Sequence, residues 1–331
     1  MDFWYKAMKF LILTTTNPYY NLAVEEYLFR HEPGDILMLW QNEPTVVIGK
    51  NQNAYVEVDL ALLRERGIHL ARRITGGGAV YHDFGNVNYT FISDTREQGM
   101  DFAHFTAPIL AALDSIGIHA TLSGRNDLLV NGLKFSGNAQ YSAGGRTLHH
   151  GTLLFDSDLG VLSSVLRPDE EKLRSKAIAS VRSRVTNLAP FLPQGYTTDT
   201  FIRLLEAYIR QEYKPLALQA PTGEEIEALF ERNASEAWLL PHSKMLSAYT
   251  RTYRARFACG SVCITLEMQQ ERIKSATVTG DFFGSAPIAE LEARFVGLCP
   301  SELPAAFYAF DPSPYIHGLS AGELSALLAE K

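Results

Sequence analysis

The dipeptide Asn131-Gly132 lies between two apolar runs, and it constrains the fold more than any other short feature of the chain. Both residues tolerate a positive φ, so the pair predicts a two-residue hairpin turn. Residues 127–130 and 133–136 should therefore pair as antiparallel strands. A further turn at residues 143–145 predicts a third strand, "TLHHGTLLF", that completes a three-stranded meander.

Strands and helices alternate through the first two thirds of the chain. "DILMLW" and "TVVIGKN", separated by "QNEP", predict a hairpin over residues 35–51. A capping Asn17 before Pro18 predicts the start of one helix, and Gly117 predicts the end of another, "DFAHFTAPILAALDSIG". Hairpins mixed with helices favour an α+β fold with mixed, largely antiparallel sheets over a doubly wound parallel one.

The pattern changes near residue 246. A helix, "TGEEIEALFER", is followed by a new β-rich run, "YRARFACGSVCITLEMQQERIKSATVTG", and then by two short helical segments. We expect a catalytic domain over residues 1–246 and a small α+β domain over residues 247–331.

Charge and composition argue against several classes of protein. The formal net charge of −7 gives no global attraction for nucleic acid, and no apolar run is long enough to span a bilayer. We therefore expect a cytoplasmic protein with neither nucleic acid nor a membrane as partner. The three cysteines are Cys259, Cys263 and Cys299, so residues 1–258 offer no cysteine nucleophile.

The stretch "RRITGGGAVYHD", residues 72–83, predicts an anion site. Three consecutive glycines can expose successive backbone N–H groups, and Arg72 or Arg73 can supply a bidentate guanidinium for phosphate oxygens. A glycine-rich turn with two solvated arginines is the alternative. The spacing matches neither the P-loop nor the dinucleotide fingerprint.

The predicted hairpin places Lys134 and Asp127 on one face as diagonal neighbours, with Asp127 opposite Ser136. A lysine between Leu133 and Phe135 suits a bound phosphate better than it suits solvent. Asp127 beside it can hold Mg²⁺, which usually takes one or two carboxylates and completes its shell with water and phosphate oxygens. The alternatives are a lysine on an open strand face and an aspartate that caps a turn.

The histidines give weaker signals. His82 directly follows the glycine run, and the adjacent His149 and His150 should point to opposite faces of a strand. At most one of this pair can therefore line a common site.

In their order and spacing, "RRITGGGAVYHD", "NDLLVNGLKFSG" and "HHGTLLF" resemble the lipoate-protein ligase A family, and "SVRSRVTNL" at residues 180–188 is similar to a further segment of it. The resemblance covers nearly the whole chain. One departure is Tyr81, where the family often has Phe.

The resemblance implies a biotin/lipoyl ligase-type catalytic domain with an accessory C-terminal domain. It also implies a two-step reaction that depends on ATP and Mg²⁺. Lipoate is first activated to lipoyl-AMP, and the lipoyl group then passes to a lysine of an acceptor lipoyl domain. Such acceptors belong to the E2 subunits of 2-oxoacid dehydrogenase complexes or to the glycine cleavage H protein. We expect the ligase itself to be a monomer.

Motif positions and the reading of the residues together give the expected site. The catalytic residue is Lys134. The ATP-binding residues are Arg73, Gly76, Gly77, Gly78, Ala79, Val80, Tyr81 and Lys134. The lipoate-binding residues are Lys134, Arg72, His82 and His150, and the metal ligand is Asp127. Possible walls of an apolar lipoyl tunnel are Leu22, Trp40, Val46 and Val47.

Two alternatives remain open at this point. One is an acyltransferase that moves a preformed octanoyl or lipoyl group between carrier domains, for which some enzymes use a cysteine nucleophile. The other is a non-enzymatic module that binds a nucleotide or a lipoyl group. The intact arginine, glycine run and lysine argue against such a module, because binding alone does not need charge aimed at a transition state.

Overall fold

The computed structural model describes residues 8–94, 100–124, 126–166, 185–241 and 250–329. The chain forms two compact units. The larger unit comprises Met1–Val47, Glu57–Arg72 and Val80–Leu239, and the C-terminal unit comprises Ile48–Val56, Arg73–Ala79 and Leu240–Lys331. Residue 246, where we placed the domain boundary, lies outside the described residues.

An eight-stranded sheet forms the centre of the larger unit. Its strand order is β11 (Leu216–Ala217), β1 (Lys9–Ile12), β2 (Ile36–Trp40), β6 (Asn86–Asp94), β10 (Arg146–Leu154), β9 (Leu133–Ala143), β8 (Asp127–Val130) and β7 (Ala120–Ser123). Only the β11–β1 and β1–β2 pairs are parallel. The prediction of an α+β fold with mixed, largely antiparallel sheets is confirmed.

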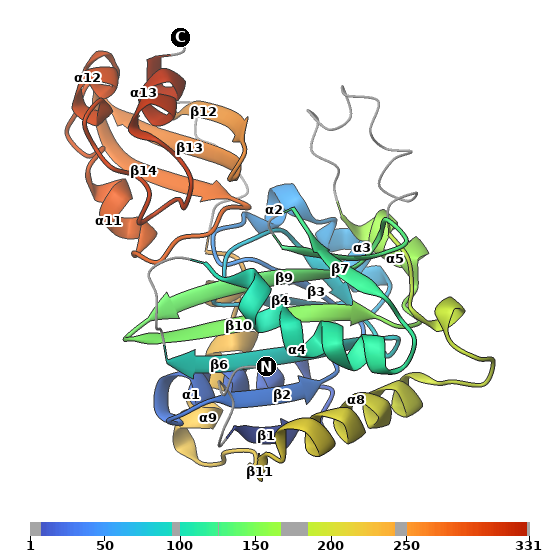
Figure 1. Ribbon diagram of the computed structural model, residues 1–331. Helices are drawn as coiled ribbons and strands as arrows, with labels where there is room; N and C mark the ends of the chain where they lie inside the picture. The colour runs from blue at the N-terminus through green and yellow to red at the C-terminus, as the bar shows by residue number, and fades with distance from the viewer. Residues whose placement is uncertain (1–7, 95–99, 125, 167–184, 242–249, 330–331) are drawn as a thin grey trace. The chain divides into compact units, whose positions relative to one another are not determined.

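Helices cover both faces of this sheet (Figure 1). On one face α4 (Phe102–Ser115) and α8 (Thr198–Tyr213) pack over a core that includes Tyr89 and Phe91 of β6. On the other face lie α1 (Pro18–His31) and α9 (Glu224–Ala234). Strand β6 is therefore buried from both sides, and its alternate residues enter different environments.

The helix signals near the N-terminus are confirmed. The Asn17 side chain accepts hydrogen bonds from the backbone N–H groups of Tyr19 and Tyr20 at 3.0 and 3.1 Å, and Pro18 occupies the first turn of α1. Helix α4 ends at Ser115, and Gly117 follows with a φ of +86°. Such a positive φ is easily reached only by glycine, so it terminates the helix.

The predicted hairpin over residues 35–51 is wrong. Strand β2 belongs to the large sheet, whereas β3 (Thr45–Ile48) lies in a separate three-stranded sheet of order β4 (His69–Arg72), β3, β5 (Val80–His82). The connection between β2 and β3 is tied to the segment before α1. The Glu43 N–H donates to the Thr16 carbonyl, and Asn42 accepts a hydrogen bond from Asn21. These hydrogen bonds direct the chain away from β2, so β3 joins a different sheet.

The hairpin at Asn131-Gly132 is confirmed, with φ values of +50° and +78°, but the predicted register is not. Leu129 pairs with Lys134, and the ladder then shifts so that Asp127 lies opposite Gly137 and not opposite Ser136. A bulge in β9 at Phe135 causes the shift, because one extra residue on one strand displaces every later partner. Strands β9 and β10 complete the predicted meander.

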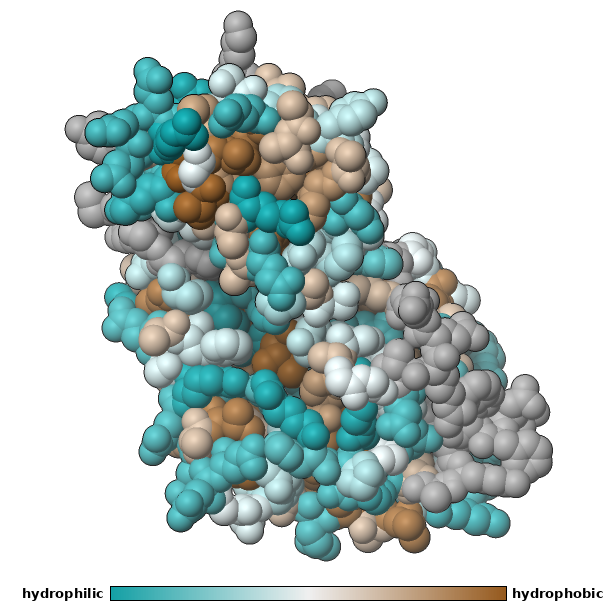
Figure 2. Space-filling model, turned by 90° about the vertical axis from the view of Figure 1, so that its left-hand side faces the viewer, coloured by the Kyte–Doolittle hydropathy of each residue, from teal (hydrophilic) through white to brown (hydrophobic). Residues whose placement is uncertain are grey.

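The C-terminal unit contains an antiparallel meander of β12 (Thr250–Phe257), β13 (Gly260–Gln269) and β14 (Arg272–Gly280). Helices α11 (Ile288–Ala293), α12 (Leu303–Phe307) and α13 (Ala321–Ala329) pack with it around a core that includes Phe282, Phe295 and Phe307. On the face drawn in Figure 2, hydrophobic areas of this unit are bordered by hydrophilic residues.

The remaining described helices are short. They are α2 (Ala54–Glu57), α3 (Leu60–Glu65), α5 (Leu159–Val165), α10 (Glu236–Leu239) and two 3₁₀ turns, Ala189–Phe191 and Pro300–Glu302. None of the helices in the described ranges has the length and apolar character that a membrane span requires.

His149 and His150 point to opposite faces of β10, as predicted. His149 is fully buried, and its ring stacks on Phe105 of α4 at a centroid distance of 5.2 Å and an interplanar angle of 12°. Within the described part of the chain, neither ring nitrogen of His149 has a hydrogen-bond partner. Burial, with smaller contributions from His150 and His104, holds the pKa of His149 well below its ordinary value of 6.5.

Because the pKa of His149 is lowered in the folded protein, we expect the free energy of unfolding to fall in acid. The unfolded chain takes up a proton at this residue below about pH 6.5, whereas the folded chain does not, so stability falls as the pH drops below 6.5. The slope from this group approaches about 1.4 kcal/mol per pH unit. We expect His149→Phe to lose that part of the slope between pH 7 and pH 5 in urea unfolding. An unchanged slope in the variant would show that His149 is protonated in the folded protein.

Candidate active site

Lys134 and Asp127 meet on the surface of the β8–β9 hairpin. The Lys134 ammonium lies 2.6 Å from a carboxylate oxygen of Asp127, and both side chains are a little over one third exposed. Gly137 leaves room for the lysine, since a Cβ at that position would lie 3.3 Å from the ammonium nitrogen. The prediction that the two residues share a face is confirmed, although the bulge changes the register that was used to derive it.

The glycine loop, residues 73–79, belongs to the C-terminal unit and packs against Phe282 and Phe283 of that unit. The Gly77 N–H donates to the Phe282 carbonyl at 3.3 Å, and a Cβ at Gly76 would lie 2.2 Å from the same oxygen. These two glycines are buried, whereas Gly78 is exposed. Only Gly78 therefore presents a solvent-accessible glycine backbone, in contrast to the row of three that the sequence suggested.

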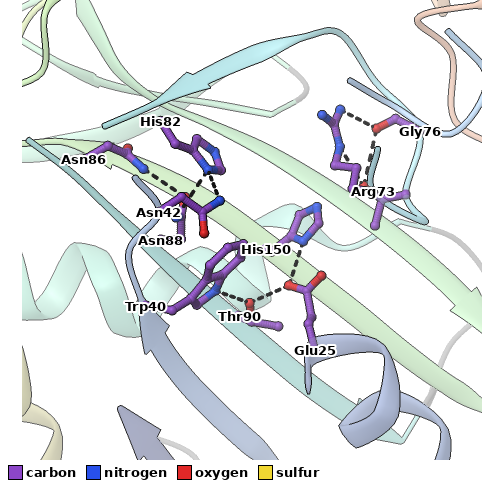
Figure 3. Close-up of polar contacts among 11 residues, drawn as sticks. Glu25, Trp40, Asn42, Arg73, Gly76, His82, Asn86, Asn88, Thr90 and His150 are labelled. Carbon is purple, nitrogen blue, oxygen red and sulfur yellow. Dashed lines mark hydrogen bonds and ion pairs between the residues drawn. The ribbon is translucent and has the colours of Figure 1, made fainter. Parts of the chain in front are cut away.

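The Arg73 guanidinium holds the shape of this loop. It is buried and donates to the Thr75 hydroxyl at 2.9 Å and to the Gly76 carbonyl at 2.7 Å (Figure 3). It also donates to the Gly78 carbonyl at 2.8 Å. A guanidinium offers five donors in a fixed plane, which suits several carbonyls of one tight turn. In this conformation the arginine contributes positive charge beneath the loop and fixes the direction of its carbonyl groups.

Arg72 points to a different element. Its guanidinium donates to the carbonyls of Trp238 and Leu239, at the end of α10, at 2.9 and 2.8 Å, and the Trp238 indole N–H donates back to the Arg72 carbonyl. Burial lowers the pKa of Arg72 to about 10, so the side chain remains charged at neutral pH. The two adjacent arginines therefore have different partners, and Arg72 anchors the end of a helix.

Two polar clusters lie on the face of the large sheet that α1 covers (Figure 3). In one cluster, His82 Nδ1 is 3.0 Å from the Asn42 side-chain amide nitrogen and 3.4 Å from that of Asn88. In the other, His150 Nδ1 is 2.8 Å from Glu25 Oε1. All of these side chains are nine tenths or more buried.

Trp40 joins the two clusters. Its ring makes an edge contact with the His82 ring at a centroid distance of 6.0 Å, and its indole N–H donates to the Thr90 hydroxyl at 2.9 Å. The Thr90 hydroxyl in turn donates to Glu25 at 2.7 Å. The structure thus brings His82, His150 and Trp40 together in the larger unit.

Sequence reasoning missed the hydrogen-bond partners of these two histidines and of Trp40, namely Asn42, Asn88, Thr90 and Glu25. The sequence does contain a signal for Asn88 and Thr90. The strand "NVNYTF" alternates polar with apolar residues, which predicts one polar face even in a buried strand. Glu25 gives no such signal, because a glutamate within a helix usually faces solvent.

Ala79, Val80 and Tyr81 lead from the loop into the small sheet. Val80 pairs with Val47 and Tyr81 pairs with Val46, so both belong to the regular ladder of β5. The Tyr81 side chain is buried, and this burial, with the nearby Asp83 and Asp158 carboxylates, raises its pKa to about 12. The proposed tunnel residues Leu22, Trp40, Val46 and Val47 are all buried.

The sequence matches two family models. Residues 17–210 match the lipoyl protein ligase A/B catalytic domain, and residues 247–328 match the C-terminus of bacterial lipoate protein ligases. Two curated relatives are a lipoate-protein ligase, LplJ, of Bacillus subtilis and lipoate-protein ligase 1 of Staphylococcus aureus. They are 38% and 36% identical to this chain, and each alignment covers 85% of this chain and 87% of the relative.

Solved structures agree with these matches. P. falciparum LipL1 in complex with lipoate has the same fold, with a TM-score of 0.77 over 92% of this chain and 95% of its own, at 24% identity. A lipoate-protein ligase A bound with ATP has a TM-score of 0.58 at 27% identity, over 71% of this chain and 98% of its own. The ligase of a bipartite system from Thermoplasma acidophilum, described with its E2 lipoyl domain, has a TM-score of 0.61 at 29% identity over 73% and 99%.

The glycine loop predicts unequal effects of two alanine substitutions on stability. Gly77 has a φ of +91°, and a Cβ there would lie 3.0 Å from the Arg73 guanidinium, so Gly77→Ala should cost about 1–3 kcal/mol. Gly78 has no such φ, and its Cβ would meet only Asp281 at 4.0 Å, so Gly78→Ala should stay within about 0.5 kcal/mol of the wild type. Urea unfolding followed by circular dichroism measures both. Equal losses would show that the loop conformation is not the one described.

Proposed function

The chain belongs to the lipoyl protein ligase A/B family, and from this premise we propose that it is an ATP-dependent lipoate-protein ligase. The observation that carries the proposal is the partly exposed Lys134 side chain on the β8–β9 hairpin of the family's catalytic domain. Within this proposal, residues 1–246 act as the catalytic domain and residues 247–331 as an accessory domain.

The first half-reaction joins two anions. A carboxylate oxygen of lipoate attacks the α-phosphorus of ATP, the bond from that phosphorus to the bridging oxygen breaks, and pyrophosphate leaves. Charge repulsion between the reactants opposes this step, so a fixed positive charge near the reacting atoms accelerates it. Lys134 supplies the charge. No general base is needed, because lipoate is already ionised at neutral pH.

The second half-reaction transfers the lipoyl group. The amine of an acceptor lysine attacks the carbonyl carbon of lipoyl-AMP, a carbon–nitrogen bond forms, and AMP leaves with the carbon–oxygen bond broken. The amine loses a proton to water or to a phosphate oxygen. The Lys134 charge polarises the same carbonyl, so one residue serves both steps.

The glycine loop supports ATP binding through Gly78 and Ala79, its solvent-accessible residues, and through the positive charge of Arg73 beneath them. The buried Gly76 and Gly77 shape the loop, and Val80 and Tyr81 continue it into β5, so we assign these four residues to the edge of the ATP site. Backbone N–H groups in a tight loop, together with a guanidinium, form a suitable cradle for phosphate oxygens.

For lipoate we propose His82 and His150, which flank Trp40 on the polar face of the sheet. Buried rings and apolar strands suit an acyl chain that ends in a dithiolane. Arg72 has less support as a lipoate ligand than the histidines, because its guanidinium donates to two main-chain carbonyls.

Mg²⁺ fits only as an ion that arrives with the phosphates of ATP. Asp127 alone among the predicted residues offers a carboxylate, and that carboxylate pairs with Lys134. No group of three or more acidic, histidine or cysteine side chains that could hold a metal ion occurs in the described ranges. We therefore assign no step to the metal.

The proposed partners are acceptor lipoyl domains of E2 subunits and the glycine cleavage H protein, and the proposed setting is a cytoplasmic monomer. Incubation with ATP, lipoate and a purified unmodified lipoyl domain tests the reaction by intact mass of the acceptor. We expect a lipoyl adduct that requires both small molecules. An adduct formed without ATP from a lipoylated carrier protein would support the acyltransferase alternative instead.

We expect removal of the Lys134 charge to slow both half-reactions. Lys134→Met keeps the apolar stem, and adenylation should slow by about 10²–10³, the usual effect of losing one preorganised donor. Transfer from chemically prepared lipoyl-AMP should slow as well. The control is Lys274→Met, which removes another strand lysine from an ion pair, with Glu267, in the C-terminal unit. Normal rates in both steps would exclude Lys134 as the catalytic residue.

Gly78→Ala, which should leave the fold intact, predicts weaker ATP binding. The added methyl group would stand where the phosphates approach the exposed backbone, and an overpacking cost of about 1–3 kcal/mol raises the Kd by roughly 5- to 150-fold. Calorimetric titration with ATP measures the change. The matched control is Gly322→Ala in α13, where nothing lies within 4 Å of the new Cβ. Unchanged ATP affinity would make the loop a structural turn.

A further inference from the structure

Two buried side-chain amides converge on one nitrogen of His82. Asn42 approaches His82 Nδ1 at 3.0 Å and Asn88 approaches it at 3.4 Å (Figure 3). Both asparagines and the histidine are less than 5% exposed. Whether His82 Nδ1 accepts or donates therefore depends on which atom of each amide faces the ring.

Main-chain carbonyls decide the orientation of Asn42. The amide nitrogen of Asn21 donates to the carbonyls of Thr15 and Gln41 at 3.1 and 2.8 Å, and carbonyls can only accept. The same nitrogen of Asn21 lies 3.0 Å from the facing atom of Asn42, which must consequently be the Asn42 oxygen. The other end of that amide, its NH₂ group, then faces His82.

Asn86 and Asn88 are two residues apart and share one face of strand β6. The Asn88 side-chain oxygen lies 2.9 Å from the amide nitrogen of Asn86. In the described part of the chain the Asn86 side-chain oxygen is buried without a hydrogen-bond partner, so no carbonyl orients this pair of amides. The Asn21–Asn42 pair, which two main-chain carbonyls orient, therefore decides which group faces the ring.

We propose that Asn42 is a positioning residue that holds His82 in the tautomer with its proton on Nε2. A nitrogen that accepts from an N–H group cannot carry a hydrogen itself, so the neutral ring keeps its hydrogen on the other nitrogen. His82 Nε2–H is then a fixed donor. Resting on the proposed function, we assign this donor to the lipoate site.

His150 carries the opposite tautomer, which provides an internal reference. The Trp40 indole can only donate, so the Thr90 hydroxyl accepts from it and sends its own hydrogen to Glu25. The Glu25 carboxylate also accepts from His150, whose hydrogen is therefore on Nδ1. The two histidines beside Trp40 thus present different nitrogens as donors.

Histidine side-chain ¹⁵N NMR of the full, ligand-free chain tests the proposal, with His82→Gln and His150→Gln used only to assign the signals. We expect Nε2–H for His82 and Nδ1–H for His150 in the wild type. Asn42→Asp replaces the amide donor with an acceptor of the same size, so His82 Nδ1 should acquire a hydrogen while His150 stays unchanged. A wild-type His82 with a hydrogen on Nδ1, or a variant in which Nδ1 stays without one, overturns the proposal.

Steady-state kinetics of the same Asn42→Asp variant test the link to the substrate. The KM for lipoate should rise about tenfold, as expected for one lost hydrogen bond, whereas the KM for ATP should stay unchanged. A tautomer that moves without any change in the lipoate KM overturns the assignment of the His82 Nε2–H donor to the lipoate site. If the wild type does not activate lipoate, the proposed function fails, while the NMR result on the ligand-free protein still decides the tautomer.

Discussion

The division of strand β6 into an apolar and a polar face is the constraint on which the larger unit depends. Over residues 86–91 its apolar side chains are Val87, Tyr89 and Phe91, and its polar ones are Asn86, Asn88 and Thr90. The first set belongs to the core beneath α4 and α8, and the second set makes hydrogen bonds beneath α1. Burial of a polar face is costly unless every group finds a partner, so the position of α1 and the orientation of both histidines follow from the same requirement.

Local signals predicted most of the elements that position the candidate site. The Asn131-Gly132 turn, the Asn17 cap and the glycine after α4 act through the backbone of a few adjacent residues, so they can be recognised without the rest of the fold. The shared face of Lys134 and Asp127 was predictable for the same reason. The resemblance to the ligase family supplied the chemistry, which composition and charge alone left open.

Features set by distant contacts were not predictable. The β2–β3 connection is turned by Asn21 and by the carbonyl of Thr16, and the bulge at Phe135 leaves no local mark in the sequence. The adjacent Arg72 and Arg73 are the same residue type, but their partners differ. Arg73 donates to carbonyls of its own loop, and Arg72 donates to carbonyls at the end of α10. A guanidinium can satisfy carbonyls as well as phosphates, so residue type did not decide between these partners.

Lipoate-dependent exchange of labelled pyrophosphate into ATP tests most directly whether the protein adenylates lipoate. Exchange requires that a carboxylate and ATP react reversibly to an acyl adenylate and pyrophosphate on the enzyme, without any acceptor protein. A lipoate-protein ligase should incorporate label into ATP only when lipoate is present. Absence of exchange in a folded protein that binds both substrates, or exchange that does not depend on lipoate, would contradict adenylation as the first step.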